Sequence, residues 1–244
     1  MKKFVYCVLA LTVLLGGCKN RNKVDGDGEE MESQDSVTVV QPKLSAEAAL
    51  QKKLKELPEE PVFDINTSMG TIKVRLFKDT PRHRDNFEKL ALNGYFDNLL
   101  FHRVIDGFMI QGGDPLTRDT LKIETWGQGG PGYTLPAEMV DADGNPLHRH
   151  KKGALAAARR GNLANPYKES SGSQFYLVQN PDNCLHLDGE YTVFGETVAG
   201  FNVIDKIAAT PADRYDRPVT AVVIYSIRPD EEMNKIDEKT ADAE

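Results

Sequence analysis

One arginine lies in an unusually apolar stretch of the sequence, residues 101–114 (FHRVIDGFMIQGGD). In a β-strand, alternate side chains face the same way, so Arg103 would share a face with Phe101 and Ile105. A cation among large apolar groups is costly unless its donors are used in hydrogen bonds. Arg103 is therefore either a donor in a functional pocket or a surface arginine that lies along apolar neighbours. On this pattern alone, the surface arginine is the stronger interpretation.

A second group of short blocks reverses that preference. Residues 172–176 read GSQFY, residues 187–189 read LDG and residues 193–195 read VFG. Together with residues 101–114, these blocks resemble the cyclophilins, the cyclosporin-binding family of peptidyl-prolyl cis-trans isomerases. Blocks that follow a family's order and spacing are a far more specific signal than one short motif. The resemblance therefore favours a catalytic role for Arg103.

The resemblance implies catalysis of rotation about the peptide bond that precedes proline. Amide resonance opposes this rotation with a barrier of about 18–20 kcal/mol, and uncatalysed exchange takes roughly 10–100 s. No covalent bond breaks, so the reaction needs no nucleophile, metal or cofactor. An arginine can donate to the prolyl nitrogen, which regains its lone pair only in the twisted state. One such charged hydrogen bond is worth about 1.5–3 kcal/mol, so the rest of any acceleration must come from the pocket.

The resemblance also implies which residues form the site. It assigns catalysis to Arg103, with Gln111 bonding near the substrate carbonyl. Ala158 and Arg159 would pair with the peptide backbone, and Gln174 would line a neighbouring pocket. The apolar proline pocket would be lined by Phe108, Met109, Tyr176 and Leu187.

Four positions depart from the family's pattern. Tyr176 replaces a phenylalanine and adds a hydroxyl, and Tyr191 replaces a histidine but can still donate a hydrogen bond. Arg159 replaces an asparagine, which would favour acidic substrates. His186 replaces the tryptophan at the pocket edge that matters for cyclosporin, so we expect weak cyclosporin binding with catalysis retained.

The elements that must position these residues are mostly short strands. Residues 63–67 and 71–77 read as a hairpin with one buried face, because Ile72, Val74 and Leu76 alternate with basic residues. Residues 81–93 predict a helix that starts after Thr80, and residues 200–209 predict a second. Many short strands with few helices indicate an antiparallel barrel or a sandwich, and the pattern does not choose between them. The resemblance, over residues 62–229, implies a mainly β fold: a closed eight-stranded antiparallel barrel capped by two α-helices.

The segments on either side of this domain have other compositions. Lys2 and Lys3 precede an apolar run, residues 4–17, which is too short to span a bilayer and has the shape of a signal peptide. The run ends in LGGC, which resembles a bacterial lipobox, so we expect cleavage after residue 17 and a lipid on Cys18. An ordinary signal peptide with an incidental Cys18 is the alternative.

Residues 18–61 would form a tether containing a short helix at about 44–57. That helix could pack on the domain or act as a spacer from the membrane, and we expect the spacer. The last segment, residues 230–244, is charged and has little apolar content, so we expect a flexible tail.

Two further patterns suggest other chemistry. Residues 127–132 (GQGGPG) fit a dinucleotide-binding pattern, but Pro131 and the residues after it supply no helix, so a glycine-rich surface loop is the better interpretation. His148 and His150 could be half of a metal site. Lys151 and Lys152 would repel a cation there, so we expect a solvated basic loop and no metal.

The composition bounds the remaining possibilities. The chain has 244 residues and a formal net charge of −7, which argues against nucleic-acid binding as its main function. We expect a monomeric isomerase, without cofactor or metal, that is exported and lipid-anchored in the bacterial cell envelope, in the outer membrane or facing the periplasm. Its partners would be proline-containing peptides and unfolded exported proteins. The alternative is a non-catalytic lipoprotein, either a scaffold or a chaperone, that binds proline-containing segments in the same groove.

Overall fold

The computed structural model describes residues 42–235, and these form one compact unit. The signal peptide, Cys18 and the tether up to residue 41 lie outside the described residues, as do residues 236–244. None of the helices within residues 42–235 is long and apolar enough to cross a membrane.

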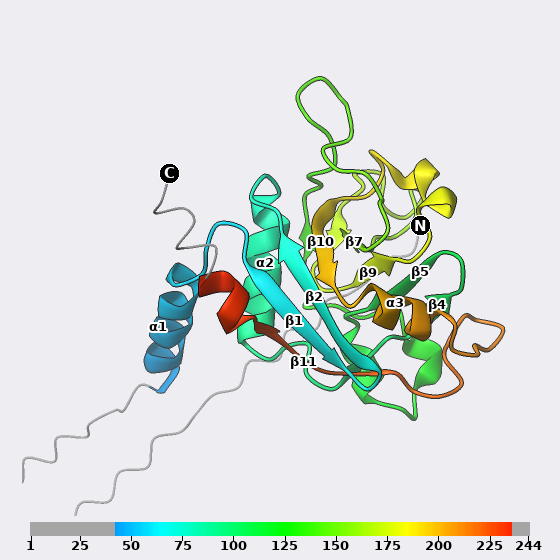
Figure 1. Cartoon of the computed structure of the whole chain (residues 1–244), viewed down its shortest axis with the longest axis horizontal. Coiled ribbons are helices and arrows are strands. Elements are labelled where there is room, and N and C mark those ends of the chain that lie inside the picture. The colour runs from blue at the N-terminus through cyan, green and yellow to red at the C-terminus, as the bar shows by residue number, and fades with distance from the viewer. Residues whose placement is uncertain (1–41, 236–244) are drawn as a thin grey trace, which may run out of the picture. The chain divides into compact units, whose positions relative to one another are not determined.

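A nine-stranded antiparallel sheet makes up most of the unit (Figure 1). Its strand order is β3-β11-β1-β2-β10-β7-β9-β5-β4, and β6 pairs with β8 in a separate ribbon. The strands are β1 (Val62–Thr67), β2 (Gly70–Leu76), β3 (Leu99–Leu100), β4 (Arg103–Ile105), β5 (Met109–Gly112), β6 (Thr134–Leu135), β7 (Ala154–Ala157), β8 (Ser170–Ser171), β9 (Phe175–Val178), β10 (Val193–Ala199) and β11 (Val223–Pro229).

The two edges of the sheet meet at the short segment between β3 and β4. The Phe101 N–H donates to the carbonyl of Val222, beside β11, whereas the His102 N–H donates to the carbonyl of Gln111 in β5. One continuous segment thus bonds to both edges, although it is too irregular for an unbroken ladder. The predicted antiparallel barrel is confirmed as a fold class. The structure differs in having nine strands, because the segment that joins the edges is split into β3 and β4, and the barrel is not fully closed.

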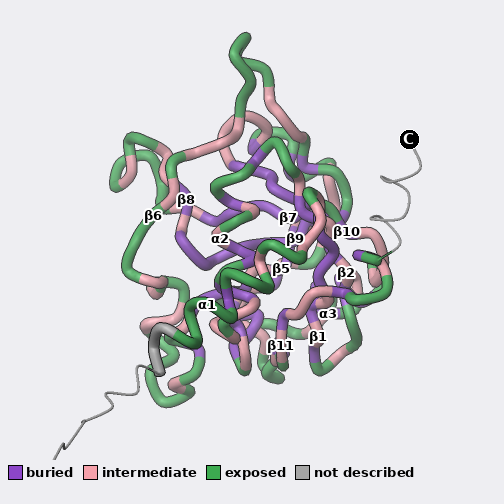
Figure 2. The backbone as a smooth tube through the Cα atoms, turned by 90° about the vertical axis from the view of Figure 1, so that its left-hand side faces the viewer, coloured by how far each residue is buried: buried purple, intermediate pink, exposed green. Residues whose placement is uncertain are grey.

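Alternation along the strands divides the apolar side chains into two groups. In β9, Phe175 and Leu177 join the main core inside the curled sheet, whereas Tyr176 and Val178 belong to a second apolar cluster. In β5, Ile110 likewise belongs to the main core and Met109 to the second cluster. Because successive strand residues point to opposite faces, the same strands build the main core and a second buried cluster on the outer face of the sheet. Figure 2 shows these central strands as the most buried part of the tube.

Two helices supply side chains to the main core. Helix α2 (Pro81–Leu92) contributes Phe87 and Ala91, and it packs against β10 and β11. Helix α3 (Phe201–Ala208) contributes Ile204 and Ile207, and it packs against β2, β4 and β5. Both predicted helices are therefore present, with starts within a residue of those expected.

The cap of α2 differs from the sequence prediction. Thr80 occupies the N-cap position, but its hydroxyl donates back to the carbonyl of Phe77. The free N–H groups of Arg82 and His83 instead donate to the two carboxylate oxygens of Glu138, both at 3.0 Å. A carboxylate is favourable at this position because it faces the positive end of the helix dipole.

The tether helix packs on the domain. It runs from Pro42 to Lys55 as α1, contacts α2 and buries Leu50. Leu57, just after it, packs against the main core. Of the two alternatives for this helix, the structure shows packing on the domain and not the expected spacer, with Leu50 as its buried apolar residue.

The start of the predicted tail is also part of the domain. Asp230 and Asn234 are buried, and residues 231–235 are helical. The Asn234 amide bonds both the N–H of Val62, at 2.7 Å, and its carbonyl, at 3.1 Å. Asp230 accepts a hydrogen bond from Lys73. A flexible tail that begins at residue 230 is thus incorrect, because this charged segment satisfies the backbone at the start of β1.

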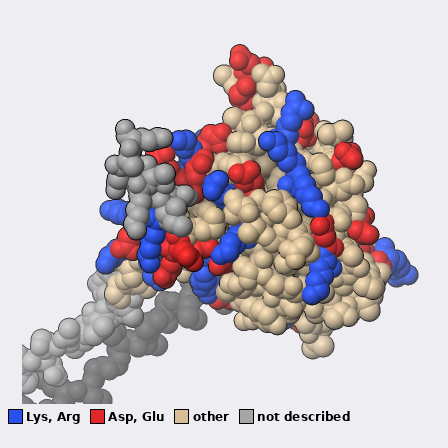
Figure 3. Space-filling model, viewed as in Figure 1, with Lys and Arg blue, Asp and Glu red and all other residues tan. Residues whose placement is uncertain are grey.

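The face that carries β1, β2 and β10 mixes both signs of charge (Figure 3). Lys73 is paired with Asp64 at 3.0 Å, and Lys152 is paired with Asp205 at 2.8 Å. These two basic side chains lie beside acidic ones, whereas other Lys and Arg side chains adjoin one another in a stripe on the same face (Figure 3).

Candidate active site

A row of paired strand residues sets the position of the site. Across β4, β5, β9 and β7, Arg103 pairs with Gln111, Gln111 with Tyr176, and Tyr176 with Ala156. Directly paired residues point to the same face of a sheet. Residues that are far apart in the sequence are therefore aligned on the outer face of the curled sheet, beside the second apolar cluster.

A pocket of about 120 Å³ opens on this face. Every residue that lines it is one that the family resemblance had assigned to the site: Arg103, Phe108, Met109, Gln111, Ala158, Arg159, Tyr176, Leu187 and Tyr191. The lining combines apolar side chains with three polar ones, those of Arg103, Gln111 and Arg159. Such a lining suits a ring-shaped apolar group that is attached to a polar backbone.

Arg103 lies at the rim of the pocket with its side chain 41% exposed. Its Nε donates to the carboxylate of Asp216 at 3.2 Å. Asp216 adopts a left-handed φ of 62°, and its carbonyl accepts from the Val104 N–H at 2.8 Å. The loop before β11 is thus docked on β4. Asp216 was missed from the sequence because it lies 113 residues from Arg103 and belongs to no recognisable motif.

His102, next to Arg103, is buried and lines neither the pocket nor the groove beside it. Burial lowers the pKa of its imidazole to about 4, and the nearby carboxylate of Asp114 opposes this shift only in part. The ring is therefore neutral at physiological pH. This agrees with a structural role and not with acid–base chemistry.

Gln174 lies outside the proline pocket and organises the groove beside it. Its amide nitrogen donates to the carbonyls of Gly127 and Gly129, and its oxygen accepts from the amide of Gln111 at 3.0 Å. The adjoining groove has a volume of about 690 Å³ and shares Gln111, Ala158 and Arg159 with the pocket. The glycine-rich segment predicted to be a surface loop thus forms one wall of this groove.

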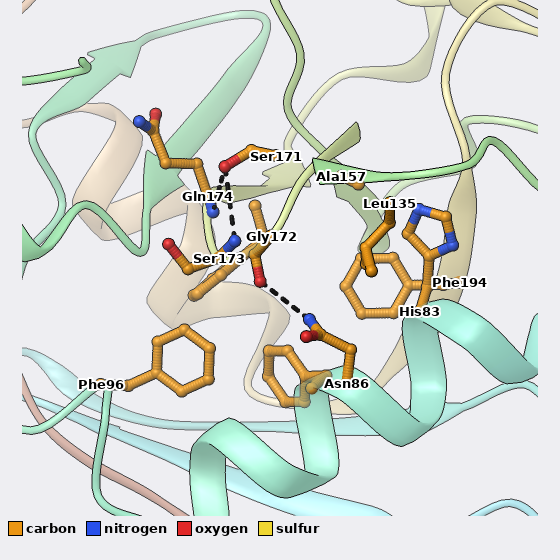
Figure 4. Close-up of a pocket in the computed structure, with 12 residues that line it drawn as sticks. His83, Asn86, Phe96, Leu135, Ala157, Ser171, Gly172, Ser173, Gln174 and Phe194 are labelled. Carbon is orange, nitrogen blue, oxygen red and sulfur yellow. Dashed lines mark hydrogen bonds between the residues drawn. The ribbon is translucent and has the colours of Figure 1, made fainter. Parts of the chain in front are cut away.

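The backbone that carries Gln174 is supported from behind by α2. A small cavity of about 10 Å³ lies between α2 and residues 171–174, and Figure 4 shows the residues that line it. The Asn86 amide donates to the carbonyl of Gly172 at 2.8 Å, and the Ser171 hydroxyl accepts from the Gln174 N–H at 3.1 Å. These bonds hold the turn that presents Gln174 to the groove.

Arg159 differs from the sequence expectation. Its side chain is only 4% exposed. The guanidinium bonds the carbonyl and carboxylate of Glu190 and the amide oxygen of Asn162, and it lies 4.3 Å above the ring of Tyr191. Its charge is therefore used within the protein. The expected preference for acidic substrates loses its basis, and Arg159 serves to hold Tyr191 in the pocket wall.

Of the predicted site residues within residues 42–235, His186 alone lines neither the pocket nor the groove. It lies in the short 3-10 turn η4 (Leu185–Leu187), where Leu187 is buried in the pocket wall while Leu185 and His186 are exposed. Because a 3-10 helix has three residues per turn, only one of three successive side chains faces the protein. The sequence position of His186 therefore did not predict its direction.

His150 corrects the prediction of a solvated basic loop. The loop does expose Arg149 and Lys151, but His150 is buried and its Nε2 lies 2.8 Å from the hydroxyl of Tyr176. His148 is also engaged, since it bonds Asp79 and stacks on a phenylalanine ring. The sequence held one signal for the contact between His150 and Tyr176, namely the extra hydroxyl of Tyr176. A hydroxyl in a buried strand requires a hydrogen-bond partner.

Comparisons with known proteins agree with this geometry. Residues 62–228 match the family model described as cyclophilin type peptidyl-prolyl cis-trans isomerase/CLD. A peptidyl-prolyl cis-trans isomerase of Helicobacter pylori is 39% identical over 160 residues, which cover 64% of this chain and 85% of that protein. A peptidyl-prolyl cis-trans isomerase-like 2 of Rhizopus delemar is 34% identical over 82% of this chain. The chain spans only about a third, 35%, of the length of that relative.

A solved structure also resembles this fold. The cyclophilin type peptidyl-prolyl cis-trans isomerase of Cryptosporidium parvum, solved in the presence of the dipeptide Ala-Pro, matches with a TM-score of 0.59 and 28% identity. The match covers 70% of this chain and 99% of that structure.

Proposed function

Because this chain belongs to the cyclophilin-type peptidyl-prolyl cis-trans isomerases, we propose that its pocket catalyses rotation about X-Pro bonds in exported polypeptides. The observation that carries the proposal is the placement of Arg103 and Gln111 in one pocket with the apolar side chains of Phe108, Met109 and Leu187. The Ala-Pro dipeptide present with the Cryptosporidium relative supports a proline ligand for this fold.

The pocket's two sides have separate tasks in this proposal. The proline ring enters between Phe108, Met109 and Leu187, which exclude water from the reacting amide. The planar amide is more charge-separated than the twisted one, so a dry pocket raises the planar form relative to the transition state. The carboxylate of Asp216 accepts a hydrogen bond from the Nε of Arg103. Among the described residues, none accepts a hydrogen bond from the two terminal nitrogens of Arg103. These can donate to the prolyl nitrogen once it becomes pyramidal.

The groove beside the pocket would hold the chain that precedes the proline. Gln111, Ala158 and Arg159 border both depressions, so an extended peptide can pass from one to the other without a turn. Gln111 is oriented by Gln174 and can bond the carbonyl next to the rotating bond. Binding on both sides of the bond lets contacts away from the ring contribute to the twist.

The deciding experiment is a proline-isomerisation assay on the full chain and on Arg103→Ala. We expect the variant to lose at least about tenfold in kcat/KM, the low end of what one charged hydrogen bond supplies. Arg82→Ala is the matched control, because Arg82 is exposed on α2 and only its backbone N–H is engaged. Equal rates for the wild type and Arg103→Ala would refute the catalytic assignment. Peptide binding without any rate enhancement would instead support the non-catalytic alternative.

We also propose that the protein is exported and held in the bacterial cell envelope by a lipid on Cys18, where unfolded exported proteins would be its clients. The support is the sequence LGGC at the end of the apolar run, residues 4–17. Cys18→Ser should move the protein from the membrane fraction to the soluble fraction, whereas Cys7→Ser should not. Unchanged membrane association of Cys18→Ser would rule out the lipid anchor.

Weak cyclosporin binding and a monomeric state remain part of the proposal. His186 is exposed and lies apart from the pocket lining, so no large ring closes the pocket edge at that position. Inhibition titrations and sedimentation measure these two properties directly.

A further inference from the structure

The side chains of Asp188, His150 and Tyr176 form a hydrogen-bonded series behind the proline pocket. The imidazole of His150 lies between the carboxylate of Asp188, with Nδ1 to Oδ1 at 2.8 Å, and the hydroxyl of Tyr176, with Nε2 to Oη at 2.8 Å. The side chain of His150 is 1% exposed and that of Asp188 is 12% exposed. Asp188 follows the turn that carries Leu187, and Tyr176 lies in β9. The hydrogen-bonded series therefore links two walls of the pocket.

The partners determine where the protons lie. A carboxylate can only accept hydrogen bonds, so Nδ1 of His150 carries the proton and donates to Asp188. The same carboxylate oxygen accepts the backbone N–H of His150 at 2.8 Å. Nε2 of the neutral ring is then an acceptor, and the Tyr176 hydroxyl must donate to it. The hydroxyl proton is therefore directed away from the substrate.

This bond determines how Tyr176 faces the pocket. The two rings are nearly parallel, at 8°, and the far end of the tyrosine is tied to His150. The ring of Tyr191 meets Tyr176 edge-to-face at a centroid distance of 6.1 Å, and Arg159 covers Tyr191. With its hydroxyl engaged behind the wall, Tyr176 presents only ring carbon and hydrogen to a proline.

We propose that His150 is a positioning residue for this site: through Tyr176 it fixes the ring that forms the pocket wall, and Asp188 fixes the tautomer of His150. This inference rests on the proposed function, since it assigns His150 to the same pocket. It gives Tyr176 a role that a phenylalanine could not have, because its ring is held by a hydrogen bond in addition to packing.

The arrangement makes the pocket sensitive to acid. Burial lowers the pKa of His150, while the hydrogen bond and charge of Asp188 oppose this and His186 adds to it. The ring is thus neutral near pH 7. Protonation would turn Nε2 into a donor, and the Tyr176 proton would lose its acceptor in a site that also contains Tyr191, Cys184 and Arg159. The wall should loosen as the pH falls below the usual range of histidine.

The test is a double-mutant cycle on the full chain with His150→Phe, Tyr176→Phe and the combined variant. The loss of one hydrogen bond changes an equilibrium constant, such as the one for peptide binding, by roughly two- to tenfold. We expect His150→Phe to raise KM by about that factor, with a smaller change in kcat, and His150→Gln, which restores an acceptor, to recover part of the loss. When His150→Phe is added to Tyr176→Phe, KM and kcat should not change further. This holds whatever the activity of Tyr176→Phe itself.

Three readouts separate this proposal from a structural role and from failure of the proposed function. In the wild type, kcat/KM should fall on the acid side, and that limb should be absent in Tyr176→Phe. Nitrogen chemical shifts of His150 should report the Nδ1–H tautomer whether or not the protein is active, and peptide affinity should follow the same cycle. An equal effect of His150→Phe in both backgrounds, or an Nε2–H tautomer, would overturn the proposal. A wild type without isomerase activity would overturn the proposed function alone.

Discussion

Asp216 provides a sensitive test of how Arg103 is held. Its carboxylate accepts from the Nε of Arg103 at 3.2 Å, and the two side chains are 43% and 41% exposed. An ion pair this exposed is worth about 0.2–1 kcal/mol, because water screens the charges and two long side chains must be ordered. If that energy serves to direct the terminal nitrogens of Arg103 into the pocket, removing it should lower kcat by about 1.4- to 5-fold.

The choice of variant matters, because Asp216 has a left-handed φ of 62° that most residues tolerate poorly. Asp216→Gly removes the carboxylate without that backbone strain, and Asp216→Asn keeps the shape without the charge. Both should lose activity at low ionic strength. At about 1 M salt, screening should bring the wild type closer to the variants. A wild-type rate equal to that of Asp216→Gly at low salt would refute this account of Arg103.

Three further predictions concern the support of the site. Burial raises the pKa of Glu88 from 4.5 to about 7, against the opposing charge of Arg84, so the wild type should lose stability as the pH rises from about 4.5 to about 7 and level off above that. In thermal unfolding, Glu88→Gln should be more stable than the wild type at pH 8 by up to about 3 kcal/mol, and not at pH 4. Gln174→Met removes three hydrogen bonds beside Gln111 and should lower kcat/KM by roughly tenfold for long peptides. Asn234→Ala leaves the buried N–H of Val62 without its acceptor, while the Val62 carbonyl keeps the N–H of Asp230; the variant should cost about 1–3 kcal/mol of unfolding free energy without changing KM.

Local patterns in the sequence predicted the elements and the apolar lining well. The alternation of Ile72, Val74 and Leu76 has the period of a half-buried strand, and the structure places these residues in the core. Thr80 and Pro81 marked the start of α2 because backbone geometry at a helix start is a local property. The pocket lining followed from motifs in which several site residues lie within a few positions of one another, as in residues 101–114.

Contacts between distant segments could not be predicted in the same way. Asp216 meets Arg103, and His150 meets Tyr176, only because strand pairing brings separate loops together. The direction of the Arg159 side chain depends on Glu190, which a sequence pattern does not reveal. The packing of α1 on α2 likewise depends on a surface that exists only after folding. In each case the sequence showed the type of residue, but it did not show which distant residue or surface that residue would contact.

The central claim is that Arg103 acts on the rotating bond and not mainly on peptide binding. Exchange spectroscopy on a proline peptide bound to the wild type and to Arg103→Lys measures the bound-state rotation rate and the Kd separately. Lysine keeps the charge but lacks the planar pair of donors. The account predicts that the Kd changes by less than about threefold while the bound-state rate falls at least about tenfold. An unchanged rate, or a loss confined to the Kd, would contradict it.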